Sequence, residues 1–302
     1  MRRREFLGVA PLPLFASGGT TLVHEHVLVD FIGADRIVPG RYDPNEVFRA
    51  AKPKLEKVKA LGCVRMLECT PQFLGRDPAL LRRLSDAAGI ELWTNTGIYG
   101  AANHKYVPAF ARQESAAQLA RRFIAEFEGG ADGVTPRFIK TGVNRGPLNE
   151  LDRKLFRAAV IASRETGLTV ASHTADGAAA LEELAIVEEE MVPPEKFVWV
   201  HAQNEKDHAI HARVARAGAW VEFDGIGRKS AAWHLECLRF MAESNLLGRT
   251  LISQDAGWYH VGEPGGGDYR GYTYIYTDFA PRLRPGWVPR LLRENPVMAF
   301  GA

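Results

Sequence analysis

The chain has 302 residues, of which 46% are hydrophobic and 25% charged, as in a globular protein that buries a core. Its 38 basic and 36 acidic side chains give a formal net charge of only +2, without a sustained basic stripe, which argues against nucleic acid as the main partner. No apolar run reaches the ~18 residues expected of a membrane-spanning helix. We therefore expect neither a nucleic-acid-binding protein nor a membrane span.

The first residues carry a candidate targeting signal. Arg3-Arg4-Glu5-Phe6-Leu7 resembles a twin-arginine export signal, and a short apolar stretch follows it. Pro11 and Pro13 interrupt that stretch, and the first predicted strand follows closely, so a basic, frayed N-terminus is the alternative. We assign residues 1–17 to this segment and residues 18–302 to one domain. A signal implies export to the periplasm, and the alternative implies a cytoplasmic protein.

Short apolar runs alternate with segments of helical period along the rest of the chain. The runs are rich in Val, Ile, Leu, Phe and Trp, as in strands that are buried on both faces. The predicted strands are Thr21–His24, Val64–Glu68, Glu91–Thr96, Arg137–Thr141, Thr169–His173, Phe197–His201, Trp220–Asp224 and Thr250–Ser253. The predicted helices are Asn45–Leu61, Glu114–Phe127, Glu150–Glu165, Ala175–Glu189, Asp207–Ala217, Ala231–Asn245 and Pro289–Arg293. Pro53 lies inside the first helical segment and predicts a kink or a break there.

The alternation of strands and helices predicts the fold class. Parallel strands with right-handed crossovers, repeated eight times in about 280 residues, indicate a single closed (β/α)₈ TIM barrel of the α/β class. An open doubly wound sheet would favour a glycine-rich phosphate turn after the first strand, where this chain has His24-Glu25-His26 instead. A long loop rich in Gly, Tyr and Pro, Ala256–Pro285, follows the eighth strand and is expected to overhang the catalytic face.

The end of the first strand carries the first metal-ligand pattern. Side chains alternate along a strand, so His24 and His26 face the same way, while Glu25 faces the helical shell. Two neutral imidazoles on one face can bind one divalent metal ion. Alone, this spacing is a weak signal, because such pairs also arise by chance on protein surfaces.

Further ligand-type residues end other strands. His173 ends the fifth strand, His201 ends the sixth, and Asp255 follows the eighth. Polar residues at the carboxyl ends of barrel strands are typical of catalytic sites. Histidines and an aspartate converging there favour Zn²⁺ or a similar borderline metal. The alternative is a set of polar rim residues that hydrogen-bond one another.

Lys140, at the end of the fourth strand, has two interpretations. A protonated ammonium has no lone pair for a metal, so it would act as an acid or as an ion-pair partner. A neutral amine that has reacted with CO₂ would instead form a carbamate, whose two oxygens can bridge two metals. Burial near cations lowers a lysine pKa and favours that neutral form.

In this order on strands one, four, five, six and eight, the residues resemble the phosphotriesterase family of the amidohydrolase superfamily. The strings Leu22–His26, Ser253–Trp258 and Glu294–Gly301 support the resemblance, which covers nearly the whole chain. The resemblance implies a binuclear metal-dependent hydrolase whose two divalent ions, with Zn²⁺ favoured, share an attacking hydroxide. The implied shell is His24, His26 and Asp255 on the buried metal, His173 and His201 on the exposed metal, and carboxylated Lys140 between them. Asp255 would also accept the proton.

The substrate implied is a small carboxylic ester or lactone, with promiscuous activity on organophosphate triesters. In lactone-cleaving members the side chain of a tyrosine at the position of Tyr99 points toward the metals. The resemblance therefore makes Tyr99 a candidate catalytic and substrate-binding residue. Such members often carry an arginine directly after the aspartate of strand seven, where this chain has Gly225, and Arg228 is a candidate replacement. The loop aromatics are candidates to line an apolar pocket. They are Trp258, Tyr259, Tyr269 and Tyr272.

Two further histidines and the three cysteines are predicted to be structural. His208 and His211 are predicted as a surface pair on a helix, and Cys63, Cys69 and Cys237 as buried core thiols, because the count is odd and no CxxC occurs. The alternatives to an ester or lactone hydrolase are a dedicated phosphotriesterase (aryldialkylphosphatase-like), a mononuclear deaminase and a non-catalytic binding barrel. Related barrels often form homodimers.

Overall fold

The computed structural model describes residues 18–301. The candidate export signal at residues 1–17 lies outside this part of the chain. Within the described residues, no helix combines the length and the apolarity that crossing a membrane requires.

The strands form a barrel of parallel neighbours in chain order. Each of the eight predicted strands is present, and their observed bounds differ from the prediction by one or two residues. The strands are β1 (Thr20–Glu25), β3 (Cys63–Glu68), β4 (Glu91–Trp93) continued by β5 (Asn95–Thr96), β6 (Phe138–Val143), β7 (Val170–Thr174), β8 (Phe197–Val200), β9 (Trp220–Phe223) and β10 (Thr250–Ile252). Hydrogen bonds join β1, β3 and β4 in one run and β5 to β10 in a second run.

The barrel closes where β10 returns to β1. The Asp255 N–H donates to the His24 carbonyl at 3.1 Å, and the His26 N–H donates to the Ala256 carbonyl at 2.9 Å. Glu25 and Ala256 form a parallel bridge at the same place. Asp255 of the predicted metal shell therefore lies in the closing seam, and Ala256 lies next to it.

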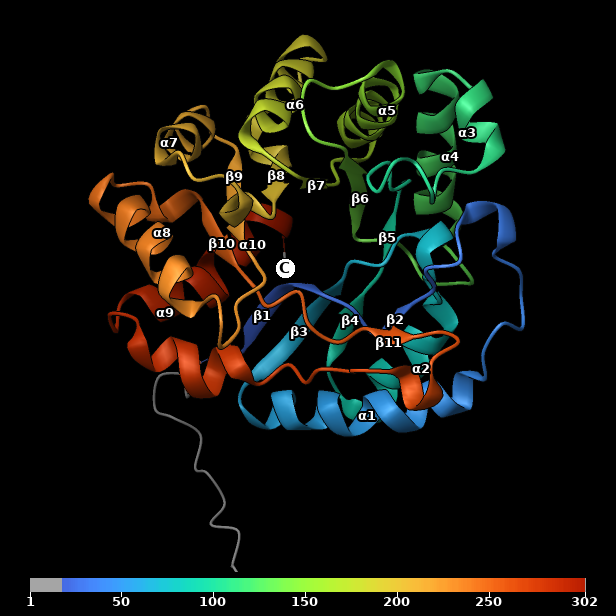
Figure 1. The fold of residues 1–302 in the computed structure, drawn as a ribbon, viewed down its shortest axis with the longest axis horizontal. Helices are drawn as coiled ribbons and strands as arrows, with labels where there is room; N and C mark the ends of the chain where they lie inside the picture. Colours follow the sequence, from blue (N-terminus) through green and yellow to red (C-terminus); the bar gives the residue numbers. More distant parts are fainter. Residues whose placement is uncertain (1–17, 302) are drawn as a thin grey trace, which may run out of the picture.

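The helices surround the strands, as Figure 1 shows. The helices are α1 (Pro44–Ala60), α2 (Pro78–Ala88), α3 (Ala109–Gln113), α4 (Ala116–Gly129), α5 (Glu150–Thr166), α6 (Gly177–Glu189), α7 (His208–Arg216), α8 (Ala231–Glu243), α9 (Trp287–Pro289) and α10 (Asn295–Phe300). Short π-helical segments occupy Ile275–Phe279 and Arg290–Glu294. The prediction omits α2, although Asp77 caps it, Pro78 begins it and Gly89 ends it in a left-handed conformation.

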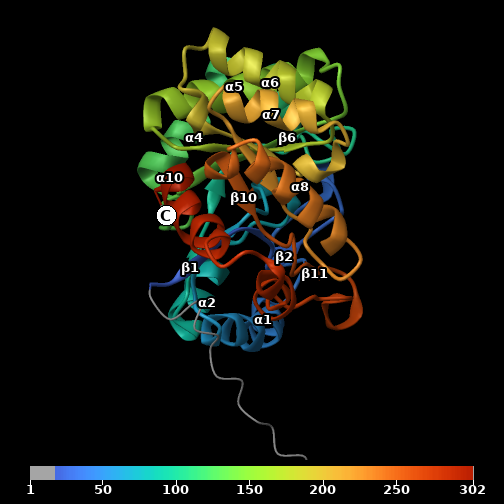
Figure 2. The ribbon, with the colours of Figure 1, turned by 90° about the vertical axis from the view of Figure 1, so that its left-hand side faces the viewer.

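Two apolar layers hold the barrel together. The outer layer lies between the strands and the helices and is the larger cluster. The inner layer fills the barrel with side chains such as Phe138, Val198 and Trp220, and Ala299 of α10 joins it from one end. In Figure 2 the C-terminus with α10 and the short strands β2 (Leu28–Val29) and β11 (Tyr259–His260) lie at opposite sides of the molecule. The end that α10 covers is therefore not the end that carries the ligand-type residues.

Two features of the chain differ from the prediction. Helix α1 runs through Pro53 as one helix, so no break occurs there. Its buried side chains pack into the outer layer on both sides of the proline, and this packing outweighs the lost backbone hydrogen bond. The loop after β10 is also more ordered than expected, because β11 pairs with β2 in parallel register.

Candidate metal centre

A cavity of about 150 Å³ opens at the carboxyl ends of the barrel strands. It brings together most of the residues that the sequence singles out. These are His24, His26, Tyr99, Lys140, His173, His201, Asp255 and Trp258. Residues from strands one, three, four, five, six and eight thus meet in one place, as the barrel topology requires.

A β-bulge turns His24 into the barrel. Between the pairs Leu22–Met66 and Glu25–Glu68, β1 advances three residues while β3 advances two. Such an insertion shifts the alternation of side chains along the bulged strand and often lies beside active sites. His24 consequently lines the cavity directly after Val23, which belongs to the inner apolar layer, and the carboxylate of Glu25 points away from the cavity, as predicted.

The ring of His26 is oriented by a threonine. His26 Nδ1 lies 2.8 Å from Thr70 Oγ1, and that hydroxyl also lies 2.9 Å from the Leu28 carbonyl and 2.6 Å from Glu68 Oε1. The hydroxyl has one proton, which it donates to one of these two oxygens, so His26 Nδ1 carries the ring proton and donates to Thr70. The lone pair of His26 is therefore on Nε2.

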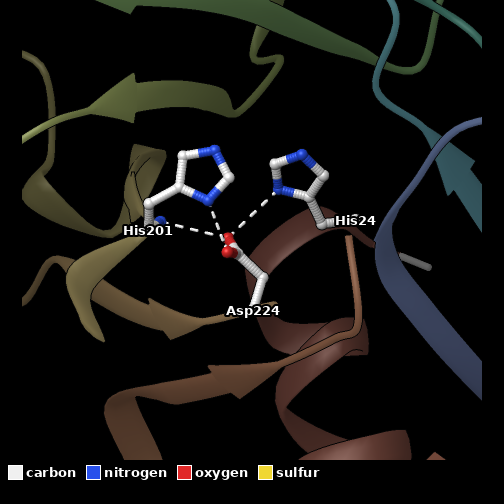
Figure 3. A group of neighbouring side chains, drawn as sticks. All are labelled: His24, His201 and Asp224. Atoms are coloured by element: carbon white, nitrogen blue, oxygen red, sulfur yellow. Dashed lines mark hydrogen bonds and ion pairs between the residues drawn. The ribbon is translucent and has the colours of Figure 1, made fainter. Parts of the chain in front are cut away.

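Carboxylates of β9 and its continuation orient the two other imidazoles. His24 Nδ1 lies 3.0 Å from Glu222 Oε1 and 3.2 Å from Asp224 Oδ2. His201 Nδ1 also bonds to Asp224 Oδ1, and Asp224 Oδ2 accepts the backbone N–H of His201 at 3.0 Å. Figure 3 shows both imidazoles directed at the single carboxylate of Asp224. Both rings therefore carry their proton on Nδ1 and keep a lone pair on Nε2, as metal-binding histidines do.

Asp255 meets the lone pairs of the first-strand histidines. Its Oδ1 lies 3.2 Å from His26 Nε2 and 3.8 Å from His24 Nε2. Within residues 18–301 this buried oxygen has no hydrogen-bond donor. Acceptors that face one another without a proton repel, and a divalent cation between them would remove that repulsion. The donor set of two imidazoles and a carboxylate fits such an ion.

Burial keeps two of the cavity histidines, His24 and His173, in the neutral form. Burial lowers the pKa of His24 to about 4, although Asp224 and Asp255 oppose the shift. Burial, with the neighbouring His201 and Lys140, lowers the pKa of His173 well below its ordinary value. Both rings are therefore neutral at pH 7, which is the state that binds a metal.

Lys140 lies fully inside the barrel. Its ammonium nitrogen has a hydrogen bond of 3.3 Å to the Thr141 carbonyl. Burial lowers the pKa of Lys140, while the carboxylates of Glu222, Asp224 and Asp255 act in the opposite direction. The net shift enlarges the neutral amine fraction, which is the reactive form of a lysine.

The backbone around the cavity adopts conformations that are uncommon for residues with side chains. Ala102, His201, Asp255 and Trp258 all line the cavity, and their φ angles are 53°, 66°, 48° and 77°. Left-handed conformations of this kind cost about 1 kcal/mol or more each and concentrate at functional sites. Their clustering here points to this cavity as the site of function.

Aromatic and apolar side chains form the mouth of the cavity. The Phe31 and Trp258 rings are 5.7 Å apart, and the Phe31 and Tyr106 rings are 6.3 Å apart. Tyr99 packs edge-on against His173 at 5.1 Å. A side chain at Gly142 would meet the Tyr99 ring at 2.9 Å, so the glycine permits this position of the tyrosine. The mouth is thus suited to an apolar substrate group.

The structure does not bring four of the predicted pocket residues to the cavity. Arg228 is exposed on the segment after β9. The hydroxyl of Tyr259 donates to Glu46 of α1 at 2.7 Å, because β11 pairs with β2 and turns this side chain toward the helical shell. Tyr269 and Tyr272 are likewise buried and hydrogen-bonded to each other at 3.0 Å.

The predicted surface pair of histidines is wrong for His211. His211 is fully buried, and its Nε2 lies 2.8 Å from the Ala202 carbonyl. Its partner His208 stacks between Trp233 and Phe240. The helix presents His211 to the barrel because Ala212 and Val214 beside it face the same buried layer.

Buried His211 predicts a loss of stability in acid. Burial lowers its pKa from 6.5 to about 4, so on acidification the unfolded chain takes up a proton that the folded chain resists. Stability is lost as the pH falls from about 6.5 toward 4, by roughly 2–3 kcal/mol for this group. We expect His211→Gln to lose less unfolding free energy than the wild type between pH 7 and pH 4.5 in urea titrations. Equal losses would contradict this assignment.

Sequence reasoning missed the groups that orient the ligands. Glu222 and Asp224 lie two residues apart on the inward face of β9 and the segment that follows it. Thr70 likewise lies two residues after Glu68, just beyond the end of β3. The signal was present, because a charged residue inside a strand that is otherwise fully buried calls for a buried partner. Phe31 and Tyr106, which come from loops, carried no comparable signal.

Removal of the Asp224 charge is expected to weaken metal binding. Asp224→Asn keeps the size of the side chain but presents a donor to one of the two imidazole N–H groups. We expect metal affinity, measured by competition with a chelator, to fall by about 10–100-fold. Asp86→Asn, an exposed position, serves as the control. Unchanged affinity in the Asp224 variant would show that this carboxylate does not orient the histidines.

The chain and its barrel are similar to several known proteins. The phosphotriesterase homology protein of Escherichia coli K12 is 28% identical over 298 residues, which cover 95% of this chain and 99% of that protein. Its crystal structure with phosphate in the active site matches with a TM-score of 0.79 at 25% identity, covering 92% of this chain and 97% of that one. The aryldialkylphosphatase of Saccharolobus solfataricus is 28% identical over 212 residues, or 69% of this chain and 67% of that protein.

A further solved structure is that of a protein in which organophosphate hydrolysis was engineered from a weak promiscuous lactonase template. It matches with a TM-score of 0.83 at 25% identity and covers 97% of each chain. The sequence model of the phosphotriesterase family matches residues 12–300. The ligand-type residues on the strand ends, the barrel and this match agree, and the chain belongs to the phosphotriesterase family.

Proposed function

We propose that this protein is a binuclear-metal-dependent hydrolase that cleaves a small carboxylic ester or lactone, with promiscuous activity on phosphotriesters. The observation that carries the proposal is the cavity, in which inward lone pairs of three oriented histidines meet an unpartnered carboxylate oxygen and a buried lysine. A cation between these acceptors would remove their mutual repulsion.

The residues divide into two ligand groups. His24, His26 and Asp255 would hold the deeper ion, and His173 with His201 would hold the outer one. Lys140, carboxylated by CO₂, would contribute an oxygen to each ion, and its buried amine with a lowered pKa supports that modification. Four histidines favour Zn²⁺. The bound ions supply a Lewis acid and an activated water.

The other residues of the chain orient the reactants and move the proton. Asp255 accepts the proton of the attacking water, because its Oδ1 lies in the cavity beside the two imidazole lone pairs and has no hydrogen-bond donor within residues 18–301. Asp224 fixes the tautomers of His24 and His201. Tyr99 and Trp258 border the cavity and hold the acyl group of the substrate.

The size of the cavity supports a compact substrate. At about 150 Å³ it is smaller than the ~300–1,000 Å³ of most ligand pockets. A small lactone ring or a short acyl group fits this space better than a dialkyl aryl phosphotriester does. The relative derived from a promiscuous lactonase also supports the lactone, and the aryldialkylphosphatase supports a dedicated phosphotriesterase as the alternative.

A substrate panel tests the proposal. Zn²⁺-reconstituted protein is assayed with γ- and δ-lactones of increasing chain length, short carboxylic esters and an aryl dialkyl phosphotriester. We expect the largest kcat/KM on a lactone or ester and a much smaller value on the phosphotriester. The Asp255→Asn variant identifies turnover that arises at this site. Turnover confined to the phosphotriester would overturn the choice of substrate, and turnover of none by protein that contains metal would overturn the proposed activity.

A further inference from the structure

Glu25 lies between two proposed ligands but does not line the cavity. It stands between His24 and His26 in the sequence, is fully buried and directs its carboxylate to the other side of β1. The proposed chemistry gives this residue no part. Burial of a carboxylate is costly unless each oxygen receives hydrogen bonds, so its partners show what it does.

The carboxylate of Glu25 binds the backbone on both sides of Asp255. Oε1 accepts the Gln254 N–H at 3.1 Å, and Oε2 accepts the Ala256 N–H at 2.7 Å. Oε1 also accepts the Ser253 hydroxyl at 2.8 Å. One side chain of the first strand therefore holds the residue before and the residue after the proposed ligand of the eighth strand.

The conformation of Asp255 explains why a carboxylate is needed. Its φ of 48° is left-handed, and its own N–H donates to the His24 carbonyl at 3.1 Å. Three successive N–H groups, at 254, 255 and 256, are thus all directed at β1, whereas in a regular strand they would alternate. Successive N–H groups beside a left-handed residue form a concavity that binds anions. The two oxygens of Glu25 occupy it.

The same contacts reach the histidine side of the site. Ser253 Oγ donates to Glu25 and accepts the His24 N–H at 3.0 Å. His24 and Asp255, whose Nε2 and Oδ1 atoms are 3.8 Å apart, are therefore both fixed to Glu25 through their backbones. Substitution of Glu25 would therefore change the distance between His24 and Asp255 but would leave both ligand side chains in place.

We propose that Glu25 is the positioning residue that fixes Asp255 against His24 and His26, and thereby sets the affinity of the deeper metal site. This inference rests on the proposed binuclear centre. Its substitution by glutamine keeps the shape but turns an amide N–H₂ toward backbone N–H groups. The backbone at Asp255 is then free to leave its left-handed conformation, which is uncommon for residues other than glycine.

Metal binding tests this role without an assay of activity. We expect Glu25→Gln to bind one of two Zn²⁺ ions at least about 10-fold more weakly than the wild type in chelator competition, while the other ion is retained. The visible spectrum of the Co²⁺-loaded variant should lose the bands of the deeper ion. Glu25→Asp, which keeps both acceptor oxygens, should recover part of the affinity. Leu119→Ala, a buried apolar position in α4, controls for loss of stability alone.

A double-variant cycle shows whether Glu25 acts through Asp255. We expect Glu25→Gln to change Zn²⁺ affinity by less than about 2-fold when it is added to Asp255→Asn, because partners in one network are not additive. Independent effects that multiply would overturn the inference, as would a Glu25→Gln variant that binds both ions as tightly as the wild type. If Glu25→Gln does not fold, Ser253→Ala, which removes both the hydroxyl donor to Glu25 and the acceptor of the His24 N–H, takes its place in the cycle. A wild-type chain that binds fewer than two ions would overturn the proposed function instead.

Discussion

Replacement of Asp255 by asparagine is expected to lower kcat by about 10³-fold or more, because the change removes a metal ligand and a proton acceptor at once. The carboxylate oxygen that faces His24 and His26 has no hydrogen-bond donor within the described chain. An amide in its place offers a neutral oxygen or an N–H group, and neither balances a divalent ion or accepts a proton near neutral pH. The loss should appear in kcat with every substrate that the wild type cleaves.

Measurement of metal content separates the two contributions of Asp255. A variant that loses both the deeper ion and turnover has lost a ligand, whereas one that keeps its metal and loses turnover has lost the proton acceptor. Asp132→Asn is a matched control, because Asp132 is exposed and has a similar left-handed φ of 47°. Near-normal turnover in Asp255→Asn would remove this residue from the mechanism.

Lys140→Ala is expected to lower metal content and activity together, and bicarbonate should not restore them. Lys140 is only 2% exposed and lines the same cavity as both groups of ligands. If its amine carries CO₂, the variant lacks the group that joins the ions, and we expect activity to fall by at least about 100-fold. Elemental analysis and turnover, each with and without bicarbonate, give the result.

The metal content of the wild type, unlike that of Lys140→Ala, should depend on bicarbonate. Reconstitution of metal-free protein under CO₂-depleted conditions should be incomplete, and bicarbonate should restore it. Lys154→Ala, on the surface of α5, controls for the loss of a lysine outside the cavity. Full metal content in Lys140→Ala would contradict the bridging role, and restoration of that variant by bicarbonate would contradict the carbamate at this residue.

The fold was predictable because its signals are local and repeated. Each buried strand reads as a run of large apolar side chains, and each ligand-type residue stands at the end of such a run, so the topology alone brings them together. Helix α2 escaped prediction although its cap at Asp77 and its glycine stop at Gly89 are visible in the sequence. The continuation of α1 through Pro53 as one helix depends on tertiary packing, which a local pattern does not contain.

The finer geometry of the site depends on contacts between distant strands. The contact of His24 with Glu222 and the hydrogen bonds of Glu25 to residues 254 and 256 join segments that are far apart in the chain. The bulge in β1 is equally invisible in the sequence of that strand, because it exists only relative to β3. Tyr259 illustrates the reverse error, since a strand pairing outside the barrel turns it away from the cavity.

The metal content of the purified protein tests the central claim most directly. The chain is prepared without chelator and with bicarbonate, loaded with Zn²⁺, separated from free ions and subjected to elemental analysis. We expect about two divalent ions per chain, held by the ligands that line the cavity. One ion or none after loading would contradict the binuclear centre and, with it, the proposed hydrolytic mechanism.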